Sequence, residues 1–413
     1  MDFIVGTFNV PALYALRFEP GKETLQVNRI ENAAGPHSWL SLSPDGTTLY
    51  CTTWSEPTSG IAAYRVERNG KGLTLLNQKN VAGRPGYVCC SDKCVYTVGG
   101  ATGEVFAIGE GGIIGDLIQE LNFSDKICAR AASNGEEVPH GDFGGLRHGA
   151  HSCDLSPDGK LLYVADIGRN CVWVYEVTAM DDAAESTNGS SSCKTGLKLV
   201  EKSIAPRSND GPRHACPHPN GNIVYSLQEH SNMVDAFRIQ RDESGSVTGL
   251  KHCGGVSVLP PGKDCAEFWA DEVRLSSGPD SSNPRYLFAS TRGLHSSTKG
   301  YVSVFALRED GTFKDDAAID IWMTPTSGGI ANAIEPAPFQ QSRHCSGIQY
   351  LSLTDSEHGL VMVLGFDGKH IREICRTILP GPKHLSKNGD AGVCQTITPP
   401  PEQTVQAATA LWL

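Results

Sequence analysis

The sequence lacks the features that mark a membrane-spanning or exported protein. None of its apolar runs approaches the ~20 residues that a helix needs to cross a bilayer. Residues 1–5 carry no basic segment followed by a long apolar stretch, so we expect no signal peptide. We therefore expect no membrane association and a cytoplasmic location.

Common signatures of metal, nucleotide and hydrolase chemistry are also missing. The 14 cysteines form no Cys-x-x-Cys pair, and in a long chain without an export signal we interpret most of them as small buried apolar residues in a reducing compartment. No glycine-rich phosphate loop lies between a strand and a helix, and no Gly-x-Ser-x-Gly elbow is present. Histidines occur at short spacings, but outside any predicted helix these spacings do not place them on one face, so we expect no metal site.

Positive charge is scarce. The formal net charge is −11, which argues against a nucleic acid partner. It does not exclude a small anionic ligand, because such a ligand responds to nearby arginines more than to the net charge. The sequence leaves open whether the chain forms a homo-oligomer.

What the sequence has in abundance is one repeated phrase. Each copy is a strand rich in aliphatic and aromatic residues, then a polar turn, then a second strand with alternating apolar positions. The seven copies lie at 4–18, 49–66, 95–108, 162–177, 224–239, 287–307 and 350–366.

Several copies are preceded by a tight turn. Pro44-Asp-Gly, Pro157-Asp-Gly and Pro219-Asn-Gly combine a proline that presets φ with a glycine suited to positive φ. The copies recur at intervals of ~45–65 residues, which is typical of four-stranded propeller blades. The sequence therefore predicts an all-β fold, a seven-bladed β-propeller that occupies residues 1–413 as a single domain.

The two ends of the chain predict how the ring closes. The first copy lacks its lead-in strand, and residues 408–413 form an apolar strand with no blade of its own. Pairing this strand with the N-terminal one would close the ring and cover both edges. The segments near 131–145 and 181–195 are interpreted as loop insertions.

Equivalent positions of the repeats carry unexpected polar residues. Six residues before the turn proline, two neighbouring copies have His151 and Arg213. Four residues after the strand aromatic, two copies have Glu229 and Arg292. Charged residues are unusual in inner strands, and a propeller gathers such positions at one end of its axis, so we expect these four side chains to converge.

The four residues suit acid–base chemistry on a carboxylate substrate. Arginine offers a planar fork that binds carboxylates, and histidine exchanges protons near neutral pH. Glu229 could orient the histidine, pair with an arginine or transfer a proton itself. The alternative is a structural set of salt bridges that ties the blades together.

The chain resembles the fungal 3-carboxy-cis,cis-muconate lactonizing enzymes, which are lactonase-type seven-bladed propellers. The resemblance covers nearly the whole chain and is strongest in the Thr-Pro-Thr-Ser-Gly-Gly phrase at 324–329. It implies a cycloisomerase without metal or organic cofactor, in which a carboxylate adds to a C=C bond of the same molecule and a proton is delivered to the adjacent carbon. The expected substrate is a small anionic tricarboxylate, 3-carboxymuconate, or a related muconate.

The resemblance also implies roles for residues of this chain. His151 would be the general acid, Arg213 and Arg292 would hold carboxylates with His214 beside them, and Glu229 would position His151 or Arg213. One departure is Ile330, which stands where the cyclase phrase has histidine. A lactone hydrolase of the 6-phosphogluconolactonase type and a non-catalytic interaction platform are the alternative functions.

Overall fold

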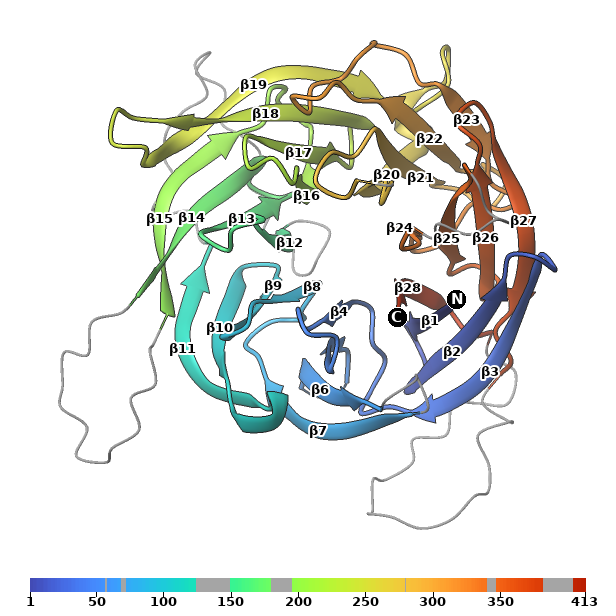
Figure 1. The fold of residues 1–413 in the computed structure, drawn as a ribbon, viewed down its shortest axis with the longest axis horizontal. Helices are drawn as coiled ribbons and strands as arrows, with labels where there is room; N and C mark the ends of the chain where they lie inside the picture. Colours follow the sequence, from blue (N-terminus) through green and yellow to red (C-terminus); the bar gives the residue numbers. More distant parts are fainter. Residues whose placement is uncertain are drawn as a thin grey trace.

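The predicted propeller is confirmed by the computed structural model. Its strands form seven four-stranded antiparallel sheets around a central axis (Figure 1). The structure describes residues 1–55, 58–67, 72–123, 149–179, 195–278, 280–339, 347–381 and 404–413. Its helical elements include the short 3-10 turns η2 (Glu110–Gly112) and η5 (Cys265–Glu267).

The blades follow one another along the chain, and each runs from an inner to an outer strand. Blade one contains β28 (Ala407–Trp412), β1 (Asp2–Thr7), β2 (Ala12–Glu19) and β3 (Thr24–Asn32). Blade two contains β4 (Leu40–Leu42), β5 (Thr48–Thr53), β6 (Gly60–Val66) and β7 (Leu73–Asn80). Blade three contains β8 (Tyr87–Cys90), β9 (Cys94–Gly99), β10 (Thr102–Ile108) and β11 (Ile114–Asn122).

The remaining blades repeat this order. Blade four contains β12 (Ala150–Leu155), β13 (Leu161–Asp166), β14 (Cys171–Ala179) and β15 (Thr195–Ile204). Blade five contains β16 (Pro212–Pro217), β17 (Ile223–Gln228), β18 (Met233–Arg241) and β19 (Val247–Ser257). Blade six contains β20 (Phe268–Leu275), β21 (Tyr286–Gly293), β22 (Tyr301–Ala306) and β23 (Asp320–Met323). Blade seven contains β24 (Asn332–Pro336), β25 (Gln349–Asp355), β26 (Leu360–Phe366) and β27 (Ile371–Ile378).

The repeated phrase corresponds to the two middle strands of each blade. Every residue of β5, β13 and β17 is buried, because both faces of these strands pack against neighbouring blades. The predicted turns join the first and second strands, and Gly46, Gly159 and Gly221 adopt φ of 72°, 68° and 71°. Glycine takes this left-handed conformation at little cost, which explains the repeated Pro-Asp-Gly and Pro-Asn-Gly turns.

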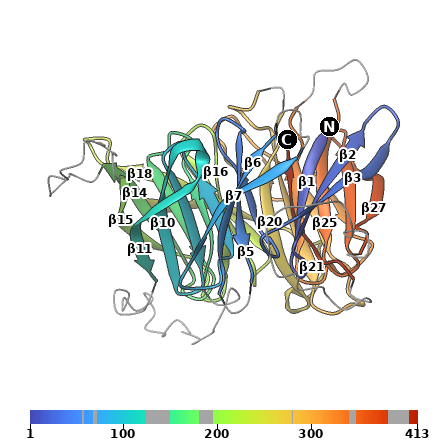
Figure 2. The same ribbon diagram turned by 90° about the horizontal axis from the view of Figure 1, so that it is seen from below.

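The ring closes as the sequence predicts. β28 pairs antiparallel with β1, with Phe3 opposite Trp412 and Ile4 opposite Leu411. Figures 1 and 2 show the two strands side by side, so blade one combines strands from opposite ends of the sequence. The predicted insertion at 131–145 lies outside the described residues, as does the one at 181–195 apart from Thr195, which begins β15.

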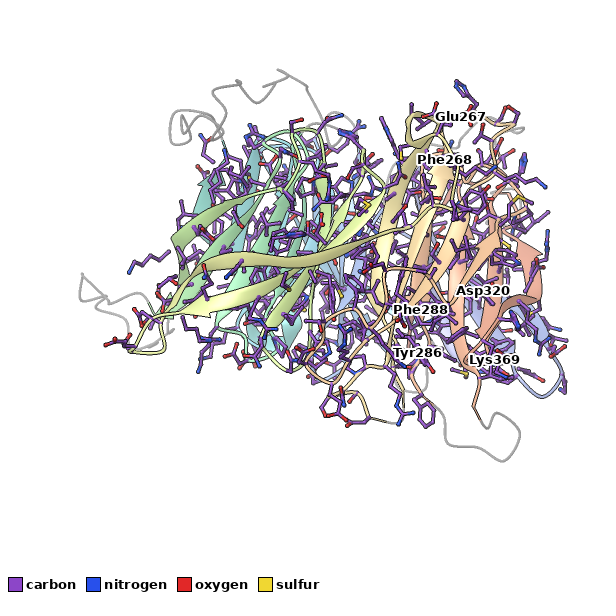
Figure 3. All side chains as sticks on the ribbon, turned by 90° about the horizontal axis from the view of Figure 1, so that it is seen from above. Glu267, Phe268, Tyr286, Phe288, Asp320 and Lys369 are labelled. Carbon is purple, nitrogen blue, oxygen red and sulfur yellow. The ribbon has the colours of Figure 1, made fainter. Side chains whose placement is uncertain are left out.

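The hydrophobic core lies between adjacent blades. Buried aromatic residues such as Trp173, Tyr225 and Phe288 fill these spaces. Figure 3 shows Glu267 near one face of the molecule and Tyr286 toward the other, so β20 begins at the face where β21 ends. Among the described residues, no helix has the length and apolar character to cross a membrane.

Candidate functional site

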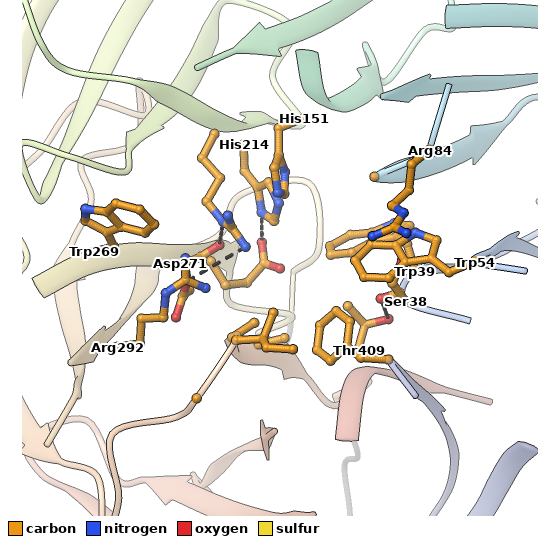
Figure 4. Close-up of a pocket in the computed structure, with 18 of the residues that line it drawn as sticks. Ser38, Trp39, Trp54, Arg84, His151, His214, Trp269, Asp271, Arg292 and Thr409 are labelled. Atoms are coloured by element: carbon orange, nitrogen blue, oxygen red, sulfur yellow. Dashed lines mark hydrogen bonds and ion pairs between the residues drawn. The ribbon is translucent and has the colours of Figure 1, made fainter. Parts of the chain in front are cut away.

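A cavity of about 730 Å³ lies where the innermost strands converge at one end of the axis (Figure 4). All seven blades contribute to its walls. From blade one to blade seven, the lining includes Thr409, Trp39, Gly86, His151, Arg213, Arg292 and Ala333. A pocket of this size accommodates a small ligand.

Three polar residues reach this cavity from β-bulges in consecutive blades. The register of the inner strand shifts between Ala150 and Ser152 in β12, which leaves His151 as the extra residue. The same shift occurs around Arg213 in β16 and around Asp271 in β20. A bulge redirects the side chain of the extra residue, and here it turns one side chain per blade into the cavity.

Two arginines and two carboxylates form a buried quartet at the cavity wall. Arg213 Nη1 lies 3.0 Å from Glu229 Oε2, and Arg292 Nη2 lies 3.2 Å from Glu229 Oε1. Asp271 Oδ1 lies 3.0 Å from Arg292 Nη1 and 3.7 Å from Arg213 Nη2. Both carboxylates thus bridge both arginines and fix the orientation of the two guanidinium planes.

The two carboxyl groups differ in their electrostatics. Burial opposes ionisation of Glu229, but the guanidinium groups of Arg213 and Arg292 outweigh it and lower the pKa of Glu229. Burial dominates at Asp271 and raises its pKa despite the same two arginines. The two arginines therefore favour the charged form of Glu229 more strongly than that of Asp271.

His151 lines the cavity next to the arginines. Its side chain is buried, and its Nδ1 has no hydrogen-bond partner among the described residues. Burial lowers the pKa of His151 well below its usual value, and the charges of Arg213, His214 and Arg292 lower it further. His151 is therefore neutral in the ligand-free site.

His214 also lines the cavity, and a carboxylate supports it. Its Nδ1 lies 2.5 Å from Glu272 Oε1, and the ring centroids of His214 and His151 are 5.2 Å apart. Figure 4 shows the two histidines side by side, and the ring of Trp39 contacts that of His214 with centroids 5.2 Å apart. Burial raises the pKa of Glu272 to about 7 and lowers that of His214 well below its usual value.

Glu272 marks the boundary between this cavity and a second one. The second cavity, of about 280 Å³, is lined by Asp154, Glu272, Arg274 and Glu335 among others. Arg274 lies between Glu272 at 2.8 Å and Glu335 at 2.7 Å. Burial raises the pKa of Asp154 to about 7, so this cavity is lined by groups that bind protons near neutral pH.

Aromatic residues frame the polar wall. Trp39 stacks on Tyr87 with ring centroids 3.9 Å apart, and Trp269 lies 5.2 Å from the guanidinium carbon of Arg292. Across the pocket, the Arg84 guanidinium carbon lies 5.2 Å from the ring of Trp54. Such contacts hold cationic side chains in place while leaving their hydrogen-bond donors available to other groups.

The glycine-rich phrase of blade seven forms part of the rim. Gly328 and Gly329 have φ of 94° and 66°, and a Cβ on either would contact Asn332 or Ser356 at 2.5–2.6 Å. This tight turn leaves Ile330 on the cavity lining with 43% of its surface exposed. The backbone N–H of Asn332 donates to Asp271 Oδ2 at 3.0 Å, so the turn also holds the arginine quartet.

The residues singled out from the sequence converge, although their contacts differ from one expectation. His151, Arg213, His214 and Arg292 line the cavity. Glu229 stands behind the arginines and bonds to both of them, whereas positioning of His151 was one of its expected roles. The expected convergence is therefore observed. The carboxylate that contacts a histidine of the cavity is Glu272, through Nδ1 of His214.

Sequence reasoning missed Asp271 and Glu272. The connection after their strand, at 276–285, is longer than the corresponding turns at 156–160 and 218–222. Counting back from the turn proline therefore does not reach the equivalent position in blade six. The available signal was the pair of adjacent acidic residues, followed by Arg274, inside a strand of aliphatic and aromatic residues at 268–275.

Comparisons with known proteins agree with this architecture. The family model described as "Lactonase, 7-bladed beta-propeller" matches residues 2–321. A solved periplasmic gluconolactonase from Pseudomonas aeruginosa has a TM-score of 0.67 and 17% identity, covering 91% of this chain and 95% of that one. At this identity the likeness concerns the fold alone.

Two relatives are informative at the level of sequence. "Muconate cycloisomerase 1" of Cutaneotrichosporon cutaneum is 44% identical over 370 residues, covering 88% of this chain and 90% of the relative. "Carboxy-cis,cis-muconate cyclase" of Neurospora crassa is 23% identical over 408 residues, covering 92% of this chain and 96% of the relative.

Proposed function

The chain belongs to the lactonase family of seven-bladed β-propellers, and we propose that it is a cycloisomerase that converts cis,cis-muconate into its lactone. The observation that carries this proposal is the 44% identity to the relative named muconate cycloisomerase, which extends over 88% of the chain. The arginine quartet beside two histidines supports it, because the reaction joins carboxylate binding to proton transfer.

The reaction forms one C–O bond and one C–H bond. A carboxylate oxygen at one end of the dianion attacks the fourth carbon and closes a five-membered ring. The electron pair of the C=C bond between the fourth and fifth carbons moves to the fifth carbon and is shared with the second carboxylate as an enolate. A proton from the protein then bonds to the fifth carbon, and the protein regains it from solvent. The step is intramolecular, so fixing the reactive rotamer supplies much of the acceleration.

We propose that Arg213 and Arg292 bind the carboxylate that becomes the enolate. Both lie in the cavity wall, and Glu229 and Asp271 hold their guanidinium planes from behind. Negative charge grows on the bound carboxylate as the ring closes, so these donors stabilise the transition state more than the substrate. The resemblance assigns delivery of the proton to His151, which lies in the same wall of the cavity.

The substrate choice follows the relatives. Identity is 44% to the protein named for muconate and 23% to the one named for carboxymuconate. The rim also presents the apolar side chains of Phe8, Leu294 and Ile330 to the cavity. These three side chains offer no hydrogen-bond donor to an additional carboxylate. We therefore assign the dicarboxylate as the preferred substrate over the tricarboxylate.

The cellular location is proposed on the cysteines. Cys89 and Cys153 have Sγ atoms 3.8 Å apart, and the described cysteines form no disulfide. Adjacent buried thiols of this kind suit a reducing compartment such as the cytoplasm.

The test is an absorbance assay with purified protein. Loss of the conjugated-diene band of cis,cis-muconate, with formation of the lactone, is the expected result, and 3-carboxymuconate should react with lower kcat/KM. A protein that hydrolyses 6-phosphogluconolactone and leaves both muconates unchanged would be a lactone hydrolase. A protein inactive on all three compounds would favour an interaction platform.

A further inference from the structure

His214 has the environment of a proton-transfer residue. It lies in β16 directly after the bulge at Arg213, and it is 1% exposed. Its Nδ1 contacts Glu272 Oε1 at 2.5 Å, whereas its buried Nε2 has no hydrogen-bond partner among the described residues. A buried polar atom without a partner is costly, and this one belongs to a ring that lines the cavity.

The neighbouring histidine lacks this support. Burial and nearby arginines lower the pKa of both rings, but the Nδ1 of His151 has no partner in the described part of the chain. A histidine that transfers protons usually needs a second group to fix its tautomer and to balance its charge. Of the two histidines in the cavity, His214 has such a group.

We propose, on the basis of the function proposed above, that Glu272 and His214 act as a dyad that delivers the proton to the carbon of the enolate. His214 is the catalytic residue that touches the substrate through Nε2. Glu272 is a positioning residue that acts through the Nδ1 of His214.

The proton balance of this step is simple. Before reaction the dyad is neutral overall, with one proton shared between Glu272 and Nδ1 and a second on Nε2. The Nε2–H bond breaks as the C–H bond forms, and the shared proton stays on Nδ1. Glu272 is then a carboxylate beside a neutral imidazole, and one proton from solvent restores the starting state. At no stage does the buried ring carry a full positive charge beside Arg213 and Arg274.

The electrostatic surroundings agree with this balance. Burial raises the pKa of Glu272 to about 7, although Arg274, the Val273 backbone N–H and Arg213 each favour its charged form. The groups around the dyad are Tyr87 from β8, His151 and Asp154 from β12, Arg213 from β16, Glu229 after β17, Arg274 from β20 and Glu335 from β24. Because the dyad donates only when Glu272 is protonated, turnover should fall as the pH rises through about 7.

The second cavity offers a route for the returning proton. Glu272 contributes to the lining of both cavities, so it can be recharged while substrate fills the first. Asp154 also lines this second cavity, and burial raises the pKa of its carboxyl group to about 7. We therefore infer that the proton returns to Glu272 through this second cavity while substrate is bound to the arginines.

The test is the variant Glu272→Gln, which keeps the shape of the side chain. The amide can either accept from Nδ1 or donate to it, but it cannot supply the proton that Nδ1 needs. We expect kcat to fall by about 10²–10⁴-fold, the usual range for loss of general acid catalysis, and the decline of activity near pH 7 to disappear. His214→Gln should lose kcat to a similar extent.

Two controls separate chemistry from folding. Glu104→Gln changes a buried carboxylate of blade three that accepts from the Ala82 backbone N–H and lines neither cavity, so it should keep kcat within about threefold. Adipate, an unreactive six-carbon dicarboxylate, should bind Glu272→Gln as it binds the native protein in calorimetric titration, because the arginines are unchanged. Loss of adipate binding by Glu272→Gln would mean that Glu272 serves the structure of the pocket and would overturn the dyad.

Other outcomes are equally decisive. If Glu272→Gln keeps native kcat and the same pH profile, the dyad is refuted. The dyad is also refuted if His151→Gln loses kcat while His214→Gln does not, and His151 is then the acid. If the native protein leaves muconate unchanged, it is the proposed function that has failed, and this is measured before any variant is made.

Discussion

Replacing Glu229 by Gln would remove the carboxylate that joins the two arginines of the site. The Glu229 carboxylate is buried and accepts from Arg213 at 3.0 Å and from Arg292 at 3.2 Å. Glutamine has the same shape but one acceptor oxygen, and its amide N–H groups would face a guanidinium. One arginine therefore loses its partner, and the pair loses half of its compensating carboxyl groups.

The expected loss of stability is large for a substitution that exchanges one carboxylate oxygen for an amide nitrogen. Breaking a buried ion pair by changing one partner costs ~3–5 kcal/mol. Asp271 still contacts both arginines, at 3.0 and 3.7 Å, so we expect the lower end of this range. An unfolding entropy of about 2.1 cal/mol/K per residue gives about 0.9 kcal/mol/K for 413 residues, so about 3 kcal/mol lowers Tm by about 3–4 °C.

Scanning calorimetry at several pH values checks this. The folded pKa of Glu229 is lowered, so its stabilisation is present above the unfolded pKa of about 4.3 and disappears as the pH falls through the folded pKa. The difference in Tm between native protein and variant should therefore close in acid. Because Glu229 stands behind the arginines, kcat of the folded variant should stay within about tenfold of native. A variant with native Tm and no turnover would refute this reasoning and place Glu229 in the chemistry itself.

Three further predictions concern the same architecture. Arg292→Lys should raise KM for muconate and lower kcat/KM by about 10–10²-fold in steady-state assays, because an ammonium cannot replace the fork that contacts Glu229 and Asp271; near-native kinetics would contradict this. Removing residues 407–413 should expose the edge of β1 and lower Tm by more than about 10 °C, and a truncated protein that melts like the native one would disprove closure by β28. Activity should survive dialysis against EDTA, and a loss restored by one divalent ion would reveal a metal requirement.

The fold was accessible from the sequence because the information is local and repeated. Middle strands such as β13 and β17 are buried on both faces, and tight turns place glycines such as Gly159 and Gly221 at positive φ. Seven weak signals at regular spacing reinforce one another. The unpaired strand at the C-terminus then predicts closure, and the register of β28 against β1 confirms it.

The site was accessible in part. The turn proline gives a reference point in blades four and five, so counting from it finds His151 and Arg213. Blade six has a longer connection, and the same count misses Asp271. The contacts from Glu229 to Arg292 and from Glu272 to His214 join blades five and six, and no periodicity within one blade encodes such contacts.

The three bulges present chemically different side chains from equivalent backbone positions. The extra residue of the bulge is His151, Arg213 or Asp271 in successive blades, so an imidazole, a guanidinium and a carboxylate share one backbone position. In all three blades the inner strand pairs with the next strand on both sides of the bulge. The strand pairing therefore accepts an imidazole, a guanidinium or a carboxylate at this position, whereas the ion pairs of Arg213 and Asp271 depend on the side chain itself. This gives a simple route by which one propeller scaffold could diverge between closing lactone rings and opening them, and it marks these three positions as the first to vary when a new activity is sought by mutagenesis.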